Sequence, residues 1–233
     1  MRWVMAAALV AASWGQGAFA REASEDALCR NGLFSSSESH WAMARVMGSE
    51  PVALLEDMSN CPEGGAPACE SGEYAKPGER VILGQSSGEY RCAYAPDAQG
   101  GGRAGWIPSR RLRLLPIVAV PPVGAWTGMW SNGTDRLRLT ANADGTLSGQ
   151  GNAYWPGPPG TNIAPLARHF GGISARAAPM GQRLELKQSA CQVTAWLLND
   201  LLVVDDNGQC GGMNVRFSGV YRKRATGSPP QPH

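Results

Sequence analysis

The chain has 233 residues, enough for one large domain or two small ones. Only 17 % of the residues are charged, and 30 Gly and 17 Pro residues indicate short elements joined by many turns, so a helical bundle or coiled coil is excluded. The formal net charge of +2 excludes a strongly basic nucleic-acid-binding protein, and a hydrophobic content of 43 % is sufficient for packed cores.

Residues 1–20 have the pattern of a secretory signal peptide. Arg2 precedes an apolar run from Trp3 to about Ser13, and Ala18-Phe19-Ala20 matches an A-x-A cleavage signal. The run is too short to remain as a membrane-spanning helix, and no later stretch reaches spanning length. The sequence therefore predicts a mature chain that begins at Arg21, has no transmembrane segment and is periplasmic or secreted.

Six cysteines remain after cleavage and predict three disulfides, because an even number in an exported chain is typical of disulfides rather than of zinc ligands. If the two halves of the chain fold separately, Cys191 pairs with Cys210, and three pairings remain for the other four cysteines. Among these we favour Cys61–Cys69, because the Pro/Gly-rich loop between them closes easily. That choice leaves Cys29–Cys92.

Strand-like segments dominate the expected first domain, residues 21–115. They are Arg80–Leu83, Glu89–Tyr94 and Ala104–Ile107, separated by Gly- and Ser-rich turns. The segment 35–59 fits either a helix over Trp41–Met47, opened by a capping box at Ser35, or strands on both sides of a Gly48–Pro51 turn. We expect the strands.

Three motifs of this first half share a known pattern: Pro77-Gly-Glu-Arg-Val-Ile-Leu83, Gly88-Glu-Tyr-Arg-Cys92 and Gly105-Trp-Ile-Pro-Ser-Arg-Arg-Leu112. They resemble a bacterial SH3-like domain over about forty residues, which implies a small barrel and, in many members, binding of cell-wall peptides. Glu89 stands where the first tryptophan of an SH3 groove would lie, and Arg110 and Arg111 replace its Asn and Tyr. The resemblance therefore implies the barrel and not the binding of proline-rich peptides.

A Pro-rich linker is predicted at 116–123, followed by a small antiparallel β-barrel or sandwich at 124–222 and a disordered tail at 223–233. Alternating apolar residues and turn signals predict its strands. The expected strands cover Arg136–Thr140, Leu184–Leu186, Cys191–Leu198, Leu201–Val204 and Met213–Phe217. The whole chain is therefore expected to be all-β.

The start of this second half carries a further pattern. Trp126-Thr-Gly-Met-Trp130-Ser-Asn132 and Asp135-Arg-Leu-Arg-Leu-Thr-Ala-Asn-Ala-Asp-Gly-Thr-Leu-Ser-Gly149 are similar to the first hairpin of avidin-type barrels, and Gly124-Ala-Trp126 fits the G-x-W of lipocalins. The resemblance implies an up-and-down barrel. Asn132 and Asp135 match ligand-contacting positions of avidins, but Gly151 and Ala153 replace the next Tyr and Ser, so biotin binding is not expected.

Two sets of residues are candidates for binding. Tyr154 and Trp155 precede a Pro/Gly-rich segment, which predicts a loop with an exposed aromatic contact surface. The other tryptophans of this half are expected in the core. Arg110 and Arg111 belong to a basic cluster that either contacts an anionic partner or forms a solvated face.

Catalytic motifs are absent from the sequence. No G-x-S-x-G elbow or phosphate loop occurs, His40 and His169 lack metal-ligand spacing, and Asp205-Asp206-Asn207-Gly208 is interpreted as a turn rather than a calcium loop. We expect no enzyme activity, no metal and no cofactor. The predicted function is an exported, non-catalytic binding protein of the bacterial cell envelope, with a cell-wall component or periplasmic protein as partner. The alternative is an inhibitor of an exported hydrolase such as lysozyme. The sequence does not predict an oligomeric state.

Overall fold

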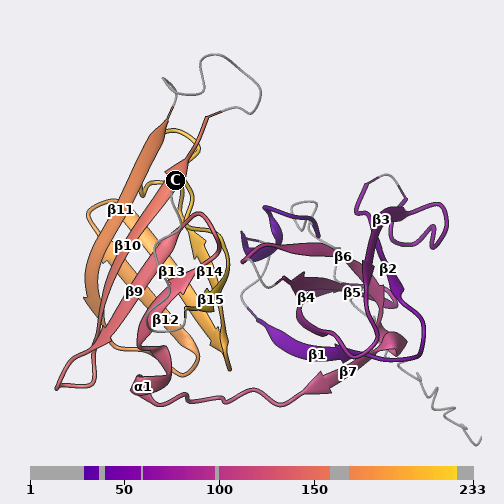
Figure 1. Ribbon diagram of the computed structural model, residues 1–233, viewed down its shortest axis with the longest axis horizontal. Helices are drawn as coiled ribbons and strands as arrows, with labels where there is room; N and C mark the ends of the chain where they lie inside the picture. Colours follow the sequence, from indigo (N-terminus) through magenta and orange to yellow (C-terminus); the bar gives the residue numbers. More distant parts are fainter. Residues whose placement is uncertain (1–28, 37–39, 59, 98–99, 158–167, 225–233) are drawn as a thin grey trace, which may run out of the picture.

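The computed structural model describes residues 29–36, 40–58, 60–97, 100–157 and 168–224, which form two antiparallel sheets joined through residues 116–122 (Figure 1). The all-β prediction is confirmed. The predicted signal peptide lies outside the described residues. Among the described residues, no helix is long and apolar enough to cross a membrane.

The first sheet contains seven strands in the order β3-β2-β6-β5-β4-β1-β7. Its core contains Leu54, Val81, Leu83 and Ile107, which are fully buried. Its elements are η1 (Phe34–Ser36), β1 (Ala42–Val46), β2 (Val52–Leu55), β3 (Glu70–Ala75), β4 (Arg80–Ser87), β5 (Tyr90–Pro96), β6 (Gly102–Pro108), η2 (Ser109–Arg111) and β7 (Leu112–Leu115). The expectation of strands rather than a helix in segment 35–59 is confirmed by β1 and β2.

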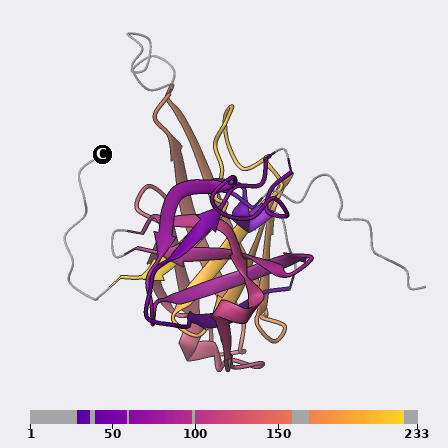
Figure 2. The same cartoon turned by 90° about the vertical axis from the view of Figure 1, so that its right-hand side faces the viewer.

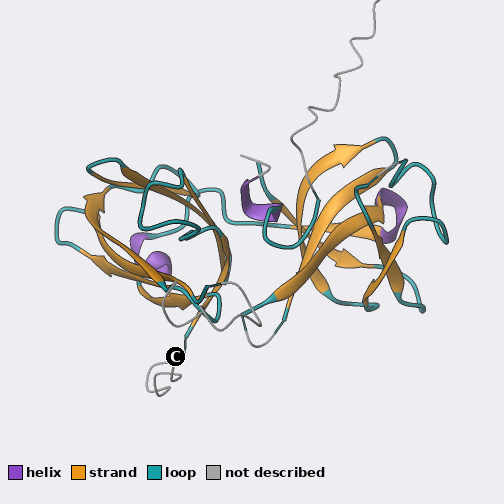
Figure 3. Cartoon of the chain, turned by 90° about the horizontal axis from the view of Figure 1, so that it is seen from above, coloured by secondary structure: helices purple, strands orange, loops and turns teal. Residues whose placement is uncertain are grey.

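The second sheet is a nearly closed eight-stranded barrel that follows the one-turn helix α1 (Val123–Trp126) (Figure 3). Each strand pairs with the next in sequence except β11 with β12, and the last strand pairs with the first. The strands are β8 (Gly128–Ser131), β9 (Arg136–Ala141), β10 (Leu147–Trp155), β11 (His169–Ala177), β12 (Arg183–Gln188), β13 (Cys191–Leu198), β14 (Leu201–Asp206) and β15 (Gly219–Lys223).

Side chains fill the interior of this barrel. Trp126, Trp130, Phe217 and Tyr221 are fully buried within it. Gly151 faces the same interior, and a Cβ atom at this position would lie 2.8 Å from the Phe217 ring. The packed interior resembles a protein core rather than a ligand cavity.

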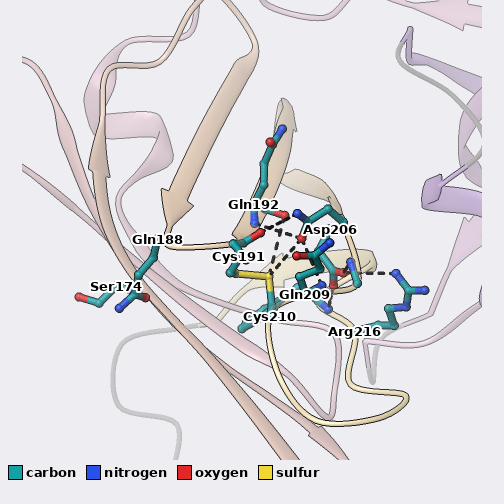
Figure 4. Close-up of a disulfide and its surroundings, with 12 residues drawn as sticks. Ser174, Gln188, Cys191, Gln192, Asp206, Gln209, Cys210 and Arg216 are labelled. Atoms are coloured by element: carbon teal, nitrogen blue, oxygen red, sulfur yellow. Dashed lines mark hydrogen bonds and ion pairs between the residues drawn. A yellow bond between two sulfur atoms is a disulfide. The ribbon is translucent and has the colours of Figure 1, made fainter.

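The gap between β11 and β12 is bridged by other groups. The backbone N–H of Ser174 donates to the Gln188 side-chain oxygen at 2.6 Å, and the N–H of Gly172 donates to the Cys210 carbonyl at 3.0 Å. Figure 4 shows Ser174 beside Gln188, to one side of the Cys191–Cys210 disulfide, which holds the loop that supplies the Cys210 carbonyl. A side chain and a disulfide-anchored loop therefore satisfy part of the exposed edge of β11.

All three predicted disulfides are present: Cys29–Cys92, Cys61–Cys69 and Cys191–Cys210. The described residues include no free cysteine. Disulfides persist in oxidising compartments, so the three bridges fit a protein that resides outside the cytoplasm.

An apolar interface joins the two sheets. Trp41 of the first sheet meets Trp196 of the barrel with ring centroids 6.2 Å apart, and Leu198, Leu201 and Val203 are buried in the same cluster. At the edge of this interface, Arg80 donates two hydrogen bonds to the Asp200 carboxylate, at 2.7 and 2.8 Å. The outer faces of β13 and β14 are thus buried against the first sheet.

The structure corrects two boundaries in the second half. Met213–Phe217 is not a strand, and β15 closes the barrel instead. Asn214 has a φ of +63°, which interrupts an extended backbone, while Val215 and Phe217 are buried and produce the alternation that predicted a strand. The predicted tail was also wrong for its first two residues, because Lys223 ends β15 and the N–H of Arg224 donates to the Met129 carbonyl.

Candidate functional site

Tyr154 and Trp155 belong to a strand, so the prediction that they lie on a loop was wrong. They are the last two residues of β10 and pair with Phe170 and His169 of β11. The ladder satisfies their backbone groups up to the residue before Pro156, which cannot donate a hydrogen bond to a sheet. The Pro/Gly-rich composition therefore begins where the pairing ends. Residues 158–167 lie outside the described residues.

The side chains of Tyr154 and Trp155 face opposite sides of the sheet, because successive residues of a strand alternate. Trp155 packs against the barrel core, and its ring lies 5.3 Å from the His169 ring. The Nδ1 atom of His169 donates to the Met213 carbonyl at 2.6 Å, which fixes the imidazole. Trp155 therefore closes one end of the barrel rather than forming a free contact residue.

Tyr154 faces outward and packs against Phe170. The two ring centroids are 5.0 Å apart at an interplanar angle of 35°, and Phe170 is 69 % exposed. The pair borders a hollow of about 430 Å³ that we call the rim site. Its lining residues are Thr134, Arg136, Asn152, Ala153, Tyr154, Arg168 and Phe170. Among these described residues are two arginines and no carboxylate, so the rim site combines an aromatic pair, of which Phe170 is exposed, with positive charge.

A buried carboxylate positions the rim site. Asp135 accepts the Tyr154 N–H through Oδ1 at 3.0 Å and the Asn132 side-chain amide through Oδ2 at 3.0 Å. The N–H of Asp135 donates to the Asn132 side-chain oxygen at 2.8 Å. Burial is the largest influence on this carboxyl and raises the pKa of Asp135 above its ordinary value. The two residues that match avidin ligand positions thus bind each other and hold the end of β10.

The other predicted contact residues, Arg110 and Arg111, lie in η2 of the first sheet. Arg111 donates to the Met47 carbonyl at 2.9 Å and to the Glu50 carbonyl at 2.8 Å, so its guanidinium holds the turn between β1 and β2. Arg110 is exposed. The structure therefore does not bring these arginines together with Tyr154, and it gives Arg111 a structural role.

Sequence reasoning missed Arg136, Arg168 and Phe170 as members of the rim site. Phe170 was not predicted as a site residue because no strand was expected at the position of β11. Arg136 was recognised only as part of a strand. Arg168 immediately precedes β11.

No group of three metal-ligating side chains is placed to hold an ion among the described residues. A further hollow of about 230 Å³ lies between the two sheets. Tyr94 lines it, and burial raises the pKa of this phenol to about 12, so the side chain is a neutral hydrogen-bonding group at neutral pH.

Comparisons of the chain with protein-family models, with curated proteins and with solved structures find no match. The SH3-like and avidin-type resemblances therefore stay predictions.

Proposed function

We propose that this chain is an exported, non-catalytic binding protein of the bacterial cell envelope, and that the rim site contacts a cell-wall component or a periplasmic protein. The observation that carries the proposal is the exposed Phe170 ring, packed against the half-buried Tyr154 beside Arg136 and Arg168. The few residues that dominate the binding free energy of protein interfaces are enriched in tryptophan, tyrosine and arginine. Phe170 is 69 % exposed, and burying its ring under a partner removes apolar surface from water, which favours binding.

The position of the pair on a strand ladder supports a binding role. Both rings project from paired strands, and the Tyr154 backbone is additionally fixed by Asp135. A rigid surface loses little conformational entropy when a partner binds. The secretory signal pattern and the disulfides support periplasmic or extracellular residence.

One observation favours the alternative, an inhibitor of an exported hydrolase such as lysozyme. Asn152 pairs with Arg136, the first residue of β9, so the last three residues of β10 extend beyond β9 together with their β11 partners. Figure 2 shows this ladder rising above the rest of the chain. A projecting element that carries arginines fits an acidic cleft.

Co-sedimentation with purified peptidoglycan sacculi and inhibition of lysozyme test the two candidates with one set of variants. The Tyr154→Ala/Phe170→Ala double variant removes the aromatic pair. Tyr74→Ala is the matched control, because Tyr74 is 43 % exposed on β3 of the other sheet. Loss of sedimentation only in the double variant supports wall binding, and loss of lysozyme inhibition only in that variant supports the alternative. Unchanged behaviour of the double variant in both assays contradicts a contact role for the rim.

A further inference from the structure

A second hollow adjoins the rim site on the same outer face of the barrel. This hollow has a volume of about 480 Å³. Its lining residues are Gln150, Gly151, Asn152, Gly172, Ile173, Ser174 and Gln188. Asn152 lines both hollows, so they adjoin each other over β10 and β11, and we call the two together the groove.

We propose, on the basis of the proposed binding function, that this groove binds a linear oligosaccharide that carries carboxylate groups. The ligand lies along β10 and β11, with one sugar against Tyr154 and Phe170 and the following sugars over Asn152 and Gln150. The arginines of the rim bind its carboxylates.

The shape of the groove fits a chain rather than a compact molecule. Tyr154, Asn152 and Gln150 follow one another on the outer face of β10, opposite Phe170, Gly172 and Ser174 of β11. The four steps from Gln150 to Tyr154 along an extended strand span about 14 Å. Gly172 has no side chain, so it leaves the base of the groove open to a ligand. A Cβ atom at this position would have the Gly151 carbonyl oxygen, at 3.6 Å, as its nearest neighbour.

The side chains of the groove match the chemistry of sugars. The face of an aromatic ring is negative, so it attracts the C–H groups on the apolar face of a pyranose. The amides of Asn152 and Gln150 and the hydroxyl of Ser174 supply donors and acceptors for sugar hydroxyls. The hydroxyls of a glycan can form hydrogen bonds with these side chains. A purely apolar ligand would leave the amides of Asn152 and Gln150 without hydrogen-bond partners.

The charges favour an acidic rather than a neutral sugar. Arg136 and Arg168 line the aromatic end, and none of the described lining residues of either hollow is Asp or Glu. A guanidinium binds a carboxylate through two parallel hydrogen bonds. An added peptide strand is less suitable over Gln150 and Asn152, because β10 pairs there with β9 on one side and with β11 on the other.

The test is isothermal titration of the full mature chain with hexagalacturonate and hexamannuronate as acidic probes and with their methyl esters as uncharged controls. We expect at least one acidic hexamer to bind, its methyl ester to bind at least tenfold more weakly, and affinity to fall as salt is raised. Phe170→Ala and Gly172→Val should each weaken binding at least tenfold, the latter by filling the floor of the groove. Thr140→Ala, on the exposed outer side of β9, is the control.

Arg168→Gln should remove most of the preference for the acidic probe over its ester while the ester still binds. The inference is overturned if neither acidic hexamer binds, if acid and ester bind equally, if Gly172→Val binds normally, or if a sugar-free wall peptide displaces the bound hexamer. Thermal melts of every variant show that binding losses are not due to unfolding. If sacculi or lysozyme are captured through Tyr154 and Phe170 but no acidic hexamer binds, the proposed function stands and this inference fails.

Discussion

Asp135 accepts the backbone N–H of Tyr154 at 3.0 Å, so a buried carboxylate in the turn between β8 and β9 fixes the point where β10 leaves the barrel. The carboxylate is held in turn by the Asn132 amide. The orientation of the Tyr154–Phe170 pair therefore depends on a residue that no ligand needs to touch.

This arrangement predicts a pH dependence of stability. Folding raises the pKa of Asp135 above its ordinary value of 3.8, so the folded state holds this proton more tightly than the unfolded chain. The contribution of Asp135 to the free energy of unfolding is complete below pH 3.8 and is lost as the pH rises through the raised pKa. Asp135→Asn removes this titration. Urea unfolding between pH 3 and 7 should show the stability of the wild type falling relative to the variant as pH rises, whereas a constant difference would contradict it.

Trp155→Ala should destabilise the protein, because Trp155 packs on the barrel core and on His169. We expect a loss of about 2–3 kcal/mol, below the range for a fully buried tryptophan because the side chain is only partly buried. Phe170→Ala is the control and should leave the thermal midpoint within about 1–2 °C. An unchanged thermal midpoint in both variants would contradict the packing of Trp155 on the barrel core.

The Cys191–Cys210 disulfide should stabilise the seam of the barrel. Replacing both cysteines by serine is expected to cost about 3 kcal/mol in the free energy of unfolding. Local opening should follow, because the Cys210 carbonyl accepts the Gly172 N–H. Hydrogen exchange should therefore accelerate at Gly172 more than at β4 or β5 of the other sheet. Uniform acceleration would indicate only a global loss of stability.

Arg111 and Arg110 should differ in their contribution to the free energy of unfolding, although they are neighbours in sequence. Arg111→Ala leaves the Met47 and Glu50 carbonyls without their guanidinium partner and should cost about 1–3 kcal/mol. Arg110→Ala, at an exposed position, should change stability by less than about 0.5 kcal/mol. Chemical unfolding of the two variants measures the difference, and equal effects would argue against the structural role of Arg111.

Local signals predicted much of the fold. The alternation of Arg136–Thr140 and the turn at Asn199-Asp200 correspond to β9 and to the β13–β14 hairpin. That hairpin sets the distance between Cys191 and Cys210. These features are predictable because they depend on neighbours in sequence.

The interface between the sheets was missed, although its signal was present. Leu197 and Leu198 precede the turn, and Leu201–Val204 follows it without a polar residue. Such continuous apolar strands are buried on both faces. One face lines the barrel, and the other packs against Trp41 and its neighbours. A purely local interpretation assigned the pattern to a single core.

The rim site was only partly predictable, because its members meet through the pairing of β10 with β11. Ile173, Ala175 and Ala177 alternate with polar residues, which is a strand signal, but Gly171 and Gly172 weaken it. The structure explains Gly171, since a Cβ atom there would lie 2.7 Å from Val215. Packing against a distant loop cannot be inferred from strand propensity.

Amide shift mapping by NMR with soluble peptidoglycan fragments tests the binding role of the rim most directly. The account predicts concentration-dependent shifts confined to residues 134–136, 150–155 and 168–174, with their loss in Phe170→Ala. Shifts confined to η2 and the first sheet would contradict it, and an absence of shifts at fragment concentrations that saturate other wall-binding proteins would contradict wall binding by the rim.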